Sequence, residues 1–95
     1  MKVEIKGIEI KTEKDFHKAI SSALNFGPYY GDNLDALWDI LTTDIERPVM
    51  LIWKDSNLSK KAMGKDFDNI INILKKVSEQ DIVWGLDRKF EFKLS

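Results

Sequence analysis

Charged and apolar side chains alternate at the start of the chain. Over residues 2–6 the apolar positions are Val3 and Ile5, and the positions around them are charged. A period of two predicts a strand with one buried face, and the pattern can continue past Gly7 through residues 8–10. The chain is therefore expected to open with a half-buried strand.

Further along, apolar residues recur at spacings of three and four, which indicate amphipathic helices. The first helix is expected to follow Thr12, a residue suited to the N-cap position, and to end near Asn25 and Gly27. Two more are expected, a short one over residues 56–63 and a longer one over residues 67–77. The apolar positions of the first helix are Phe16, Ala19, Ile20, Ala23 and Leu24.

A continuous apolar run, Val49–Trp53, lies between the helical segments and directly follows Pro48. Such runs are typical of strands covered on both faces in parallel sheets, so this one predicts a parallel α/β sheet. The end of the chain permits two interpretations. Residues 81–86 form either part of a longer connection or an extra C-terminal edge strand, and residues 90–94 alternate as a further strand.

The most distinctive segment is Tyr29–Asp39, which reads YYGDNLDALWD. It begins in a loop over residues 26–31, where glycine and proline punctuate the chain and Gly31 can take backbone angles closed to other residues. Adjacent tyrosines on a loop are rarely both buried. We expect at least one of them to pack beneath the loop, and their rings to offer rigid contact area for a partner.

A helix is expected from about Leu34 to Leu41, because Asn33 can accept N–H bonds that a helix start leaves unpaired. The spacing of its residues gives it two faces. Trp38 lies at the border between them, so it can either complete the core or contact a partner. The apolar face comprises Leu34, Leu37 and Leu41, and the polar face comprises Asp35, Asp39 and Thr42.

The same region has an uneven charge distribution. No Lys or Arg lies between Lys18 and Arg47, whereas five acidic residues do, which gives this interval a net charge of −5. Because the whole chain carries −1, the remainder carries +4. Near neutrality thus conceals an acidic surface that would attract basic partners. The acidic residues are Asp32, Asp35, Asp39, Asp44 and Glu46.

Length and composition set the remaining expectations. A chain of 95 residues with 43% hydrophobic content predicts one domain over residues 1–95, with a core that needs no metal or disulfide. The chain has no cysteine, which excludes disulfides and thiolate metal sites and is compatible with a reducing compartment. Neither an export signal nor a membrane span is indicated. We expect a cytoplasmic protein that is monomeric when free.

Chemistry other than protein binding has little support in the sequence. His17 is expected on the first helix as an exposed or packed side chain rather than a general base. Asp35 and Asp39 make a poor acid/base pair on an exposed helix face. The acids around Asn33 lack the central glycine and terminal glutamate of a calcium loop, and the lysines have no aromatic platform for nucleic acid. We expect neither an enzyme nor a bound metal or cofactor.

The Tyr29–Asp39 segment resembles the matching segment of the barstar family, whose members are small intracellular inhibitors of secreted ribonucleases of the barnase type. The likeness is looser over the rest of the chain, where the order of strands and helices is similar. The residues that carry it are Tyr29, Tyr30, Gly31, Asn33, Leu34, Asp35, Ala36, Leu37, Trp38 and Asp39.

This resemblance implies a small α/β fold in which a three-stranded parallel sheet packs with about four helices. It also implies an inhibitor that needs no cofactor and covers the active site of a basic, barnase-like ribonuclease. Asp39 would enter the phosphate site of the enzyme, and Asp35 would pair with a flanking basic residue. The implied partner-binding residues are Tyr29, Tyr30, Gly31, Asn33, Asp35, Trp38, Asp39 and Thr42.

One residue departs from the family pattern. The last long helix of the family carries a glutamate that adds to the acidic face, whereas this chain has Lys76 beside Lys75. The sequence also leaves a second function open, that of a barstar-like interaction module that keeps the fold and the acidic patch but binds a basic protein other than a ribonuclease.

Overall fold

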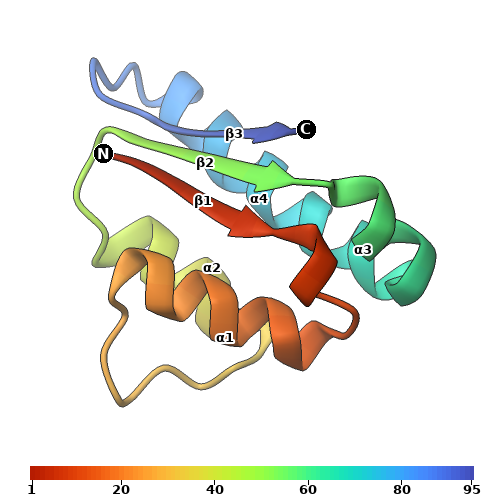
Figure 1. Ribbon diagram of the computed structural model, residues 1–95. Helices are drawn as coiled ribbons and strands as arrows, with labels where there is room; N and C mark the ends of the chain where they lie inside the picture. Colours follow the sequence, from red (N-terminus) through yellow and green to blue (C-terminus); the bar gives the residue numbers. More distant parts are fainter.

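The computed structural model describes residues 1–95, which form three strands, four α-helices and one 3-10 turn (Figure 1). The chain alternates one strand with a pair of helices, as the resemblance implied. The elements are β1 (Lys2–Lys6), η1 (Gly7–Glu9), α1 (Glu13–Leu24), α2 (Leu34–Thr43), β2 (Val49–Lys54), α3 (Ser56–Met63), α4 (Lys65–Val83) and β3 (Phe90–Leu94).

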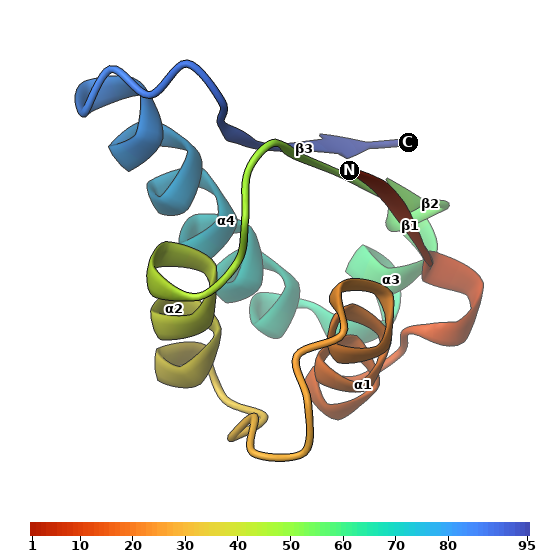
Figure 2. The same cartoon turned by 90° about the vertical axis from the view of Figure 1, so that its left-hand side faces the viewer.

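The three strands form one parallel sheet in the order β1-β2-β3, which confirms the expected fold class. Leu51 in the central strand pairs with Val3 on one side and Phe92 on the other. All four helices lie on the same side of this sheet (Figure 2). The core therefore sits between the sheet and a single helical layer.

The expectation that the central strand is covered on both faces is wrong. Val49, Leu51 and Trp53 are buried, whereas Met50 and Ile52 between them are only half-buried. Ile52 lies in register with Glu4 and Lys93 of the neighbouring strands. Charged side chains thus flank the apolar residues on the open face, and long charged side chains can cover apolar surface with their aliphatic stems.

The helix starts follow the local signals in the sequence. The Thr12 side chain accepts a hydrogen bond from the Asp15 N–H at 3.1 Å, and Asn33 does the same for the N–H of Ala36 at 2.8 Å. Asn25 closes α1 in the left-handed conformation, with φ of 56°. The predicted limits of α1 and the predicted start of α2 are thereby confirmed.

No extra edge strand forms near the C-terminus, and the longer connection is the correct alternative. Residues 81–83 continue α4, residues 84–89 connect, and β3 alone completes the sheet. The apolar stripe of α4 extends at helical spacing as far as Asp81, which is 1% exposed. Its carboxylate accepts a bond from the Phe90 N–H at 2.7 Å, so the end of the helix and the last strand are joined directly.

Candidate functional site

The loop before α2 takes its shape from two residues with positive φ. Gly27 has φ of 86° and Asp32 has φ of 54°, the latter in a region that aspartate tolerates better than most residues. Gly31 is outside that region, so it does not use the conformational freedom that glycine offers there. A Cβ on Gly31 would approach the Ala36 Cβ and the Asn33 Nδ2 to 3.3 Å. Gly31 therefore lets the loop pack closely against the start of α2, where a larger residue would be in tight contact with these two side chains.

Asn33 holds the junction of loop and helix from both sides. Its Oδ1 caps the first turn of α2, and its Nδ2 donates to the Gly31 carbonyl at 3.2 Å. Asp35 follows in the first turn, where the partial positive charge of the helix terminus favours an acid. The site therefore begins on a well-anchored helix start.

The two faces of α2 are arranged as the spacing predicts. Leu37 and Leu41 are 0% exposed in the core, while Asp35 and Asp39 are exposed on the opposite side. Trp38 is half-buried and packs against the core cluster while keeping part of its ring accessible. It thus contributes to the core packing, and contact of its accessible part with a partner stays a prediction.

The end of α2 carries two hydroxyl groups that bond to the helix itself. Thr42 donates to the Trp38 carbonyl at 2.7 Å, and Thr43 donates to the Asp39 carbonyl at 2.6 Å. These bonds satisfy the hydroxyl protons within the helix. Thr42 can then offer a partner only the acceptor capacity of its oxygen and its methyl group.

An open groove of about 390 Å³ runs between the loop and α2. It brings two loop tyrosines and Gly31 together with the carboxylate of Asp39, which lies on the next element. Asn33, Asp35, Trp38 and Thr42 lie outside the groove, so the predicted residues form two adjoining groups. The lining residues are Phe26, Tyr29, Tyr30, Gly31, Ala36, Asp39, Ile40 and Asp44.

The two tyrosines have different positions. Tyr29 is 96% exposed, whereas Tyr30 is half-buried with its hydroxyl 2.6 Å from Nδ1 of His17. His17 itself is 1% exposed, so of the two predicted states for this histidine the packed one is correct. The expectation that at least one tyrosine packs beneath the loop is confirmed for Tyr30.

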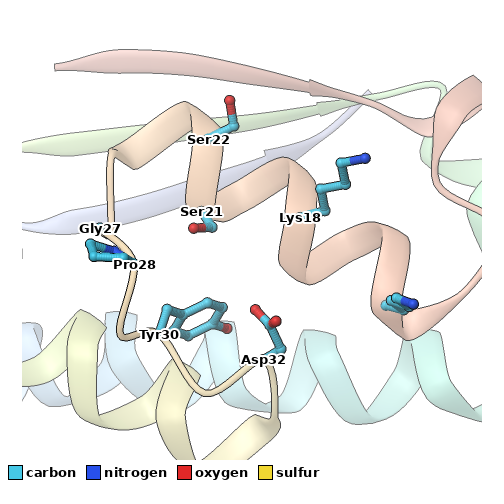
Figure 3. Close-up of a pocket in the computed structure, with 8 residues that line it drawn as sticks. Lys18, Ser21, Ser22, Gly27, Pro28, Tyr30 and Asp32 are labelled. Atoms are coloured by element: carbon cyan, nitrogen blue, oxygen red, sulfur yellow. The ribbon is translucent and has the colours of Figure 1, made fainter.

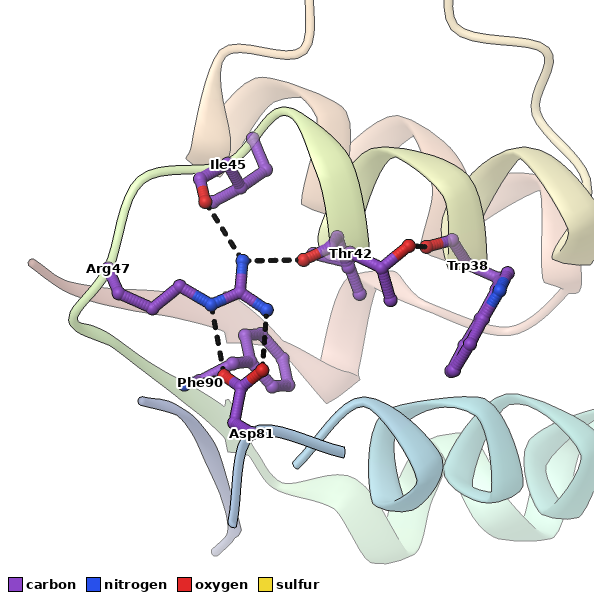
Figure 4. Close-up of polar contacts among 7 residues, drawn as sticks. Trp38, Thr42, Ile45, Arg47, Asp81 and Phe90 are labelled. Carbon is purple, nitrogen blue, oxygen red and sulfur yellow. Dashed lines mark hydrogen bonds and ion pairs between the residues drawn. The ribbon is translucent and has the colours of Figure 1, made fainter. Parts of the chain in front are cut away.

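The acidic interval between Lys18 and Arg47 keeps its negative field. Arg47, the first basic residue after it, forms an ion pair with Asp81 instead. Arg47 Nε and Nη2 donate to the two carboxylate oxygens of Asp81 at 2.9 and 3.0 Å (Figure 4). Nη1 donates to the carbonyls of Leu41 and Ile45 at 2.6 and 2.9 Å. The guanidinium thus closes the C-terminal end of α2 and joins it to α4, and it does not neutralise the carboxylates on the exposed face.

Asp81 is the residue of structural importance that the sequence reasoning missed. Burial by itself would raise the pKa of this carboxyl group, but hydrogen bonds from Arg47 and the Phe90 N–H outweigh it and hold the pKa below its ordinary value. The helical spacing of the sequence could have indicated that Asp81 is buried, because it follows Leu74 and Val77 along the apolar stripe of α4. A carboxylate at such a position requires a buried partner.

The structure shows no cluster of side chains for metal binding and no helix suited to a membrane. No group of three or more His, Cys, Asp or Glu side chains is placed to hold a metal ion. None of the helices combines the length and the apolar character needed to cross a bilayer. The exposed acidic face and the adjoining groove are thus the features that the site offers.

Comparison with known proteins identifies relatives of the chain. The model of the family Barstar, described as barstar (barnase inhibitor), matches residues 1–95. A Bacillus subtilis (strain 168) protein named "Putative ribonuclease inhibitor YrdF" is 32% identical over 79 residues. That alignment covers 83% of this chain and 87% of the relative.

Proposed function

The chain belongs to the barstar family of ribonuclease inhibitors, and we propose that it covers the active site of a barnase-type ribonuclease with α2 and the loop before it. Inhibitors of this family bind their target and catalyse no reaction. The family assignment does not say which surface of the chain contacts the ribonuclease, and our proposal names that surface. We also propose a cytoplasmic location and a monomeric free form, as the family resemblance implies.

The proposed mechanism is mimicry of the phosphates of RNA. A ribonuclease active site gathers basic side chains to hold phosphate groups, and carboxylates on a rigid helix can occupy those positions with charge-assisted, often bidentate bonds. Asp39 would enter the phosphate site, and Asp35 would pair with a basic residue beside it. Tyr29 would supply rigid aromatic area at the edge of the same surface. The remaining predicted contact residues are Tyr30, Gly31, Asn33, Trp38 and Thr42.

One observation supports this proposal above the others. Asp39 is exposed on α2 and also lines the groove against the loop, so a partner side chain can meet the carboxylate and the tyrosines together. Titration of a barnase-type ribonuclease with this protein tests the proposal. Activity on RNA should fall linearly to zero at equimolar inhibitor. An Asp35→Ala/Asp39→Ala double variant should inhibit far more weakly, and full activity at a large excess of the wild-type protein would refute the proposal.

A second candidate function rests on Lys76. This side chain is exposed on α4, where the family resemblance implies a glutamate. A reversed sign on the binding edge would reject a barnase-type partner and favour a basic protein that presents an acid at that point. Affinity purification from cell and culture extracts, with the double variant in parallel, decides between the two. Loss of a small basic ribonuclease supports inhibition, and loss of an unrelated protein supports the interaction module.

Association with the ribonuclease should slow markedly as salt rises from tens to hundreds of millimolar. The Debye length falls from about 30 Å at 0.01 M to about 10 Å at 0.1 M, which screens the field of the acidic interval. The barnase–barstar pair is itself the reference case for such steering. Stopped-flow rates measure the effect, and an Asp44→Asn/Glu46→Gln variant should show a shallower salt dependence. An on-rate insensitive to salt would count against steering by this surface.

Lys76→Glu is expected to tighten binding to barnase itself, because the substitution replaces a charge that repels the basic rim of the enzyme. It should loosen binding to the natural partner if that partner presents an acid there. Calorimetry at fixed salt measures both affinities, and Lys75→Glu on the adjacent exposed position is the matched control. Unchanged affinity in both complexes would place residue 76 outside the interface.

A further inference from the structure

His17 connects helix α1 to the loop that precedes α2. Its ring is 1% exposed, Nδ1 lies 2.6 Å from the Tyr30 hydroxyl, and Nε2 lies 2.9 Å from a carboxylate oxygen of Glu13. Glu13 is the first residue of the same helix. The histidine therefore has both ring nitrogens engaged, one within its own helix and one across to the loop.

The chemistry of the two partners sets the direction of each bond. An ionised carboxylate can only accept, so Nε2 must carry the proton of the neutral ring and Nδ1 must accept. The phenol then donates. Burial raises the pKa of Tyr30 well above its ordinary value, and the charges of Asp32 and Glu13 act in the same direction. The hydroxyl thus keeps its proton and can donate it in a hydrogen bond to Nδ1 of the neutral ring.

The loop depends on this contact because its backbone holds little else. Residues 27–32 take part in none of the backbone–backbone hydrogen bonds of the molecule. The Tyr30 ring lies beneath α1 (Figure 3) and packs edge-on against Phe26, with ring centres 4.8 Å apart. At the end of the loop, the Asn33 amide bonds to the Gly31 carbonyl. Side-chain contacts therefore anchor the loop, and the His17–Tyr30 bond is the hydrogen bond that joins it to α1.

We infer that His17 is a positioning residue for inhibition: by accepting a hydrogen bond from the Tyr30 hydroxyl, it holds the loop in the conformation that presents Tyr29 beside Asp39. The binding consequence rests on the proposed function, whereas the ordering of the loop does not. A loop already held in its bound conformation loses less entropy on association. Tyr30 then acts through its anchorage to α1 rather than as a free contact residue.

The test uses Tyr30→Phe, which keeps the ring against Phe26 and removes only the donor. In the free protein, backbone order parameters of residues 27–32 should fall from the rigid range near about 0.85 towards the flexible range below about 0.6. Dissociation from a barnase-type ribonuclease should become roughly two- to tenfold faster, the range expected for one net hydrogen bond. NMR of the wild-type imidazole should show the Nε2-protonated tautomer.

Matched variants separate positioning from loss of stability. Ile20→Val removes a buried methyl group from the same helix and should leave loop order and dissociation unchanged. His17→Leu should reproduce the effect of Tyr30→Phe, and His17→Gln should restore part of the loop order because its amide oxygen can accept. Wild-type order parameters or an unchanged dissociation rate in Tyr30→Phe would overturn the inference. If the wild-type protein does not inhibit a ribonuclease, the proposed function fails while the order parameters still test the positioning.

Discussion

Replacing Asp39 by alanine is expected to weaken the complex with the ribonuclease by roughly 4 to 8 kcal/mol, more than any other single change on this surface. The physical reason is that the substitution leaves the basic groups of the enzyme buried without a counter-charge. The magnitude comes from barstar itself, where an aspartate is an extreme example of a binding hot spot. Inhibition constants or calorimetry with the purified ribonuclease provide the measurement.

The same substitution should leave the folded protein almost unchanged. Asp39 is exposed, and the Thr43 hydroxyl bonds to its backbone carbonyl rather than to its carboxylate. Thermal unfolding of Asp39→Ala should therefore match the wild type. Asp87→Ala removes an exposed carboxylate from the connection after α4 and is the control for a general loss of negative charge. Equal inhibition by Asp39→Ala and wild type would rule out phosphate mimicry by this residue.

The largest effect on stability is expected from Asp81→Ala, with a loss of roughly 3–5 kcal/mol in the free energy of unfolding. The substitution leaves the Arg47 guanidinium, whose side chain is 13% exposed, without its counter-ion. It also removes the acceptor of the buried Phe90 N–H. Denaturant unfolding measures the loss, with Asp87→Ala again as the exposed control. A loss below about 1 kcal/mol would show that water satisfies Arg47 as well as Asp81 does.

The pH dependence of stability follows from the same ion pair. The pKa of Asp81 is lower in the folded protein than its ordinary value, so the folded state binds this proton less tightly than the unfolded state does. The stabilisation is complete above the ordinary carboxyl pKa of about 3.9 and is lost as the pH falls through the lowered folded value. Asp81→Asn should lack this component of acid unfolding, whereas Asp87→Asn should keep it.

The sequence by itself determined most of the elements and pointed to one acidic surface with adjoining tyrosines, because their signals lie within a few residues of one another. Helix spacing and the caps at Thr12 and Asn33 are local properties of the chain, and the structure agrees with them. The acidic interval is likewise a fact of the sequence. The Tyr29–Asp39 segment was distinctive enough to indicate the family.

Only the tertiary structure decided which side chains meet and which face of the sheet remains open. Arg47 and Asp81 are 34 residues apart, and His17 and Tyr30 are 13 apart, so no local period relates them. The apolar run of β2 could not reveal that all helices lie on one side of the sheet. Residues 81–86 suited either a strand or a connection, and the buried Arg47–Asp81 pair favours the longer helix. Such choices depend on packing between distant segments, which sequence periodicity does not encode.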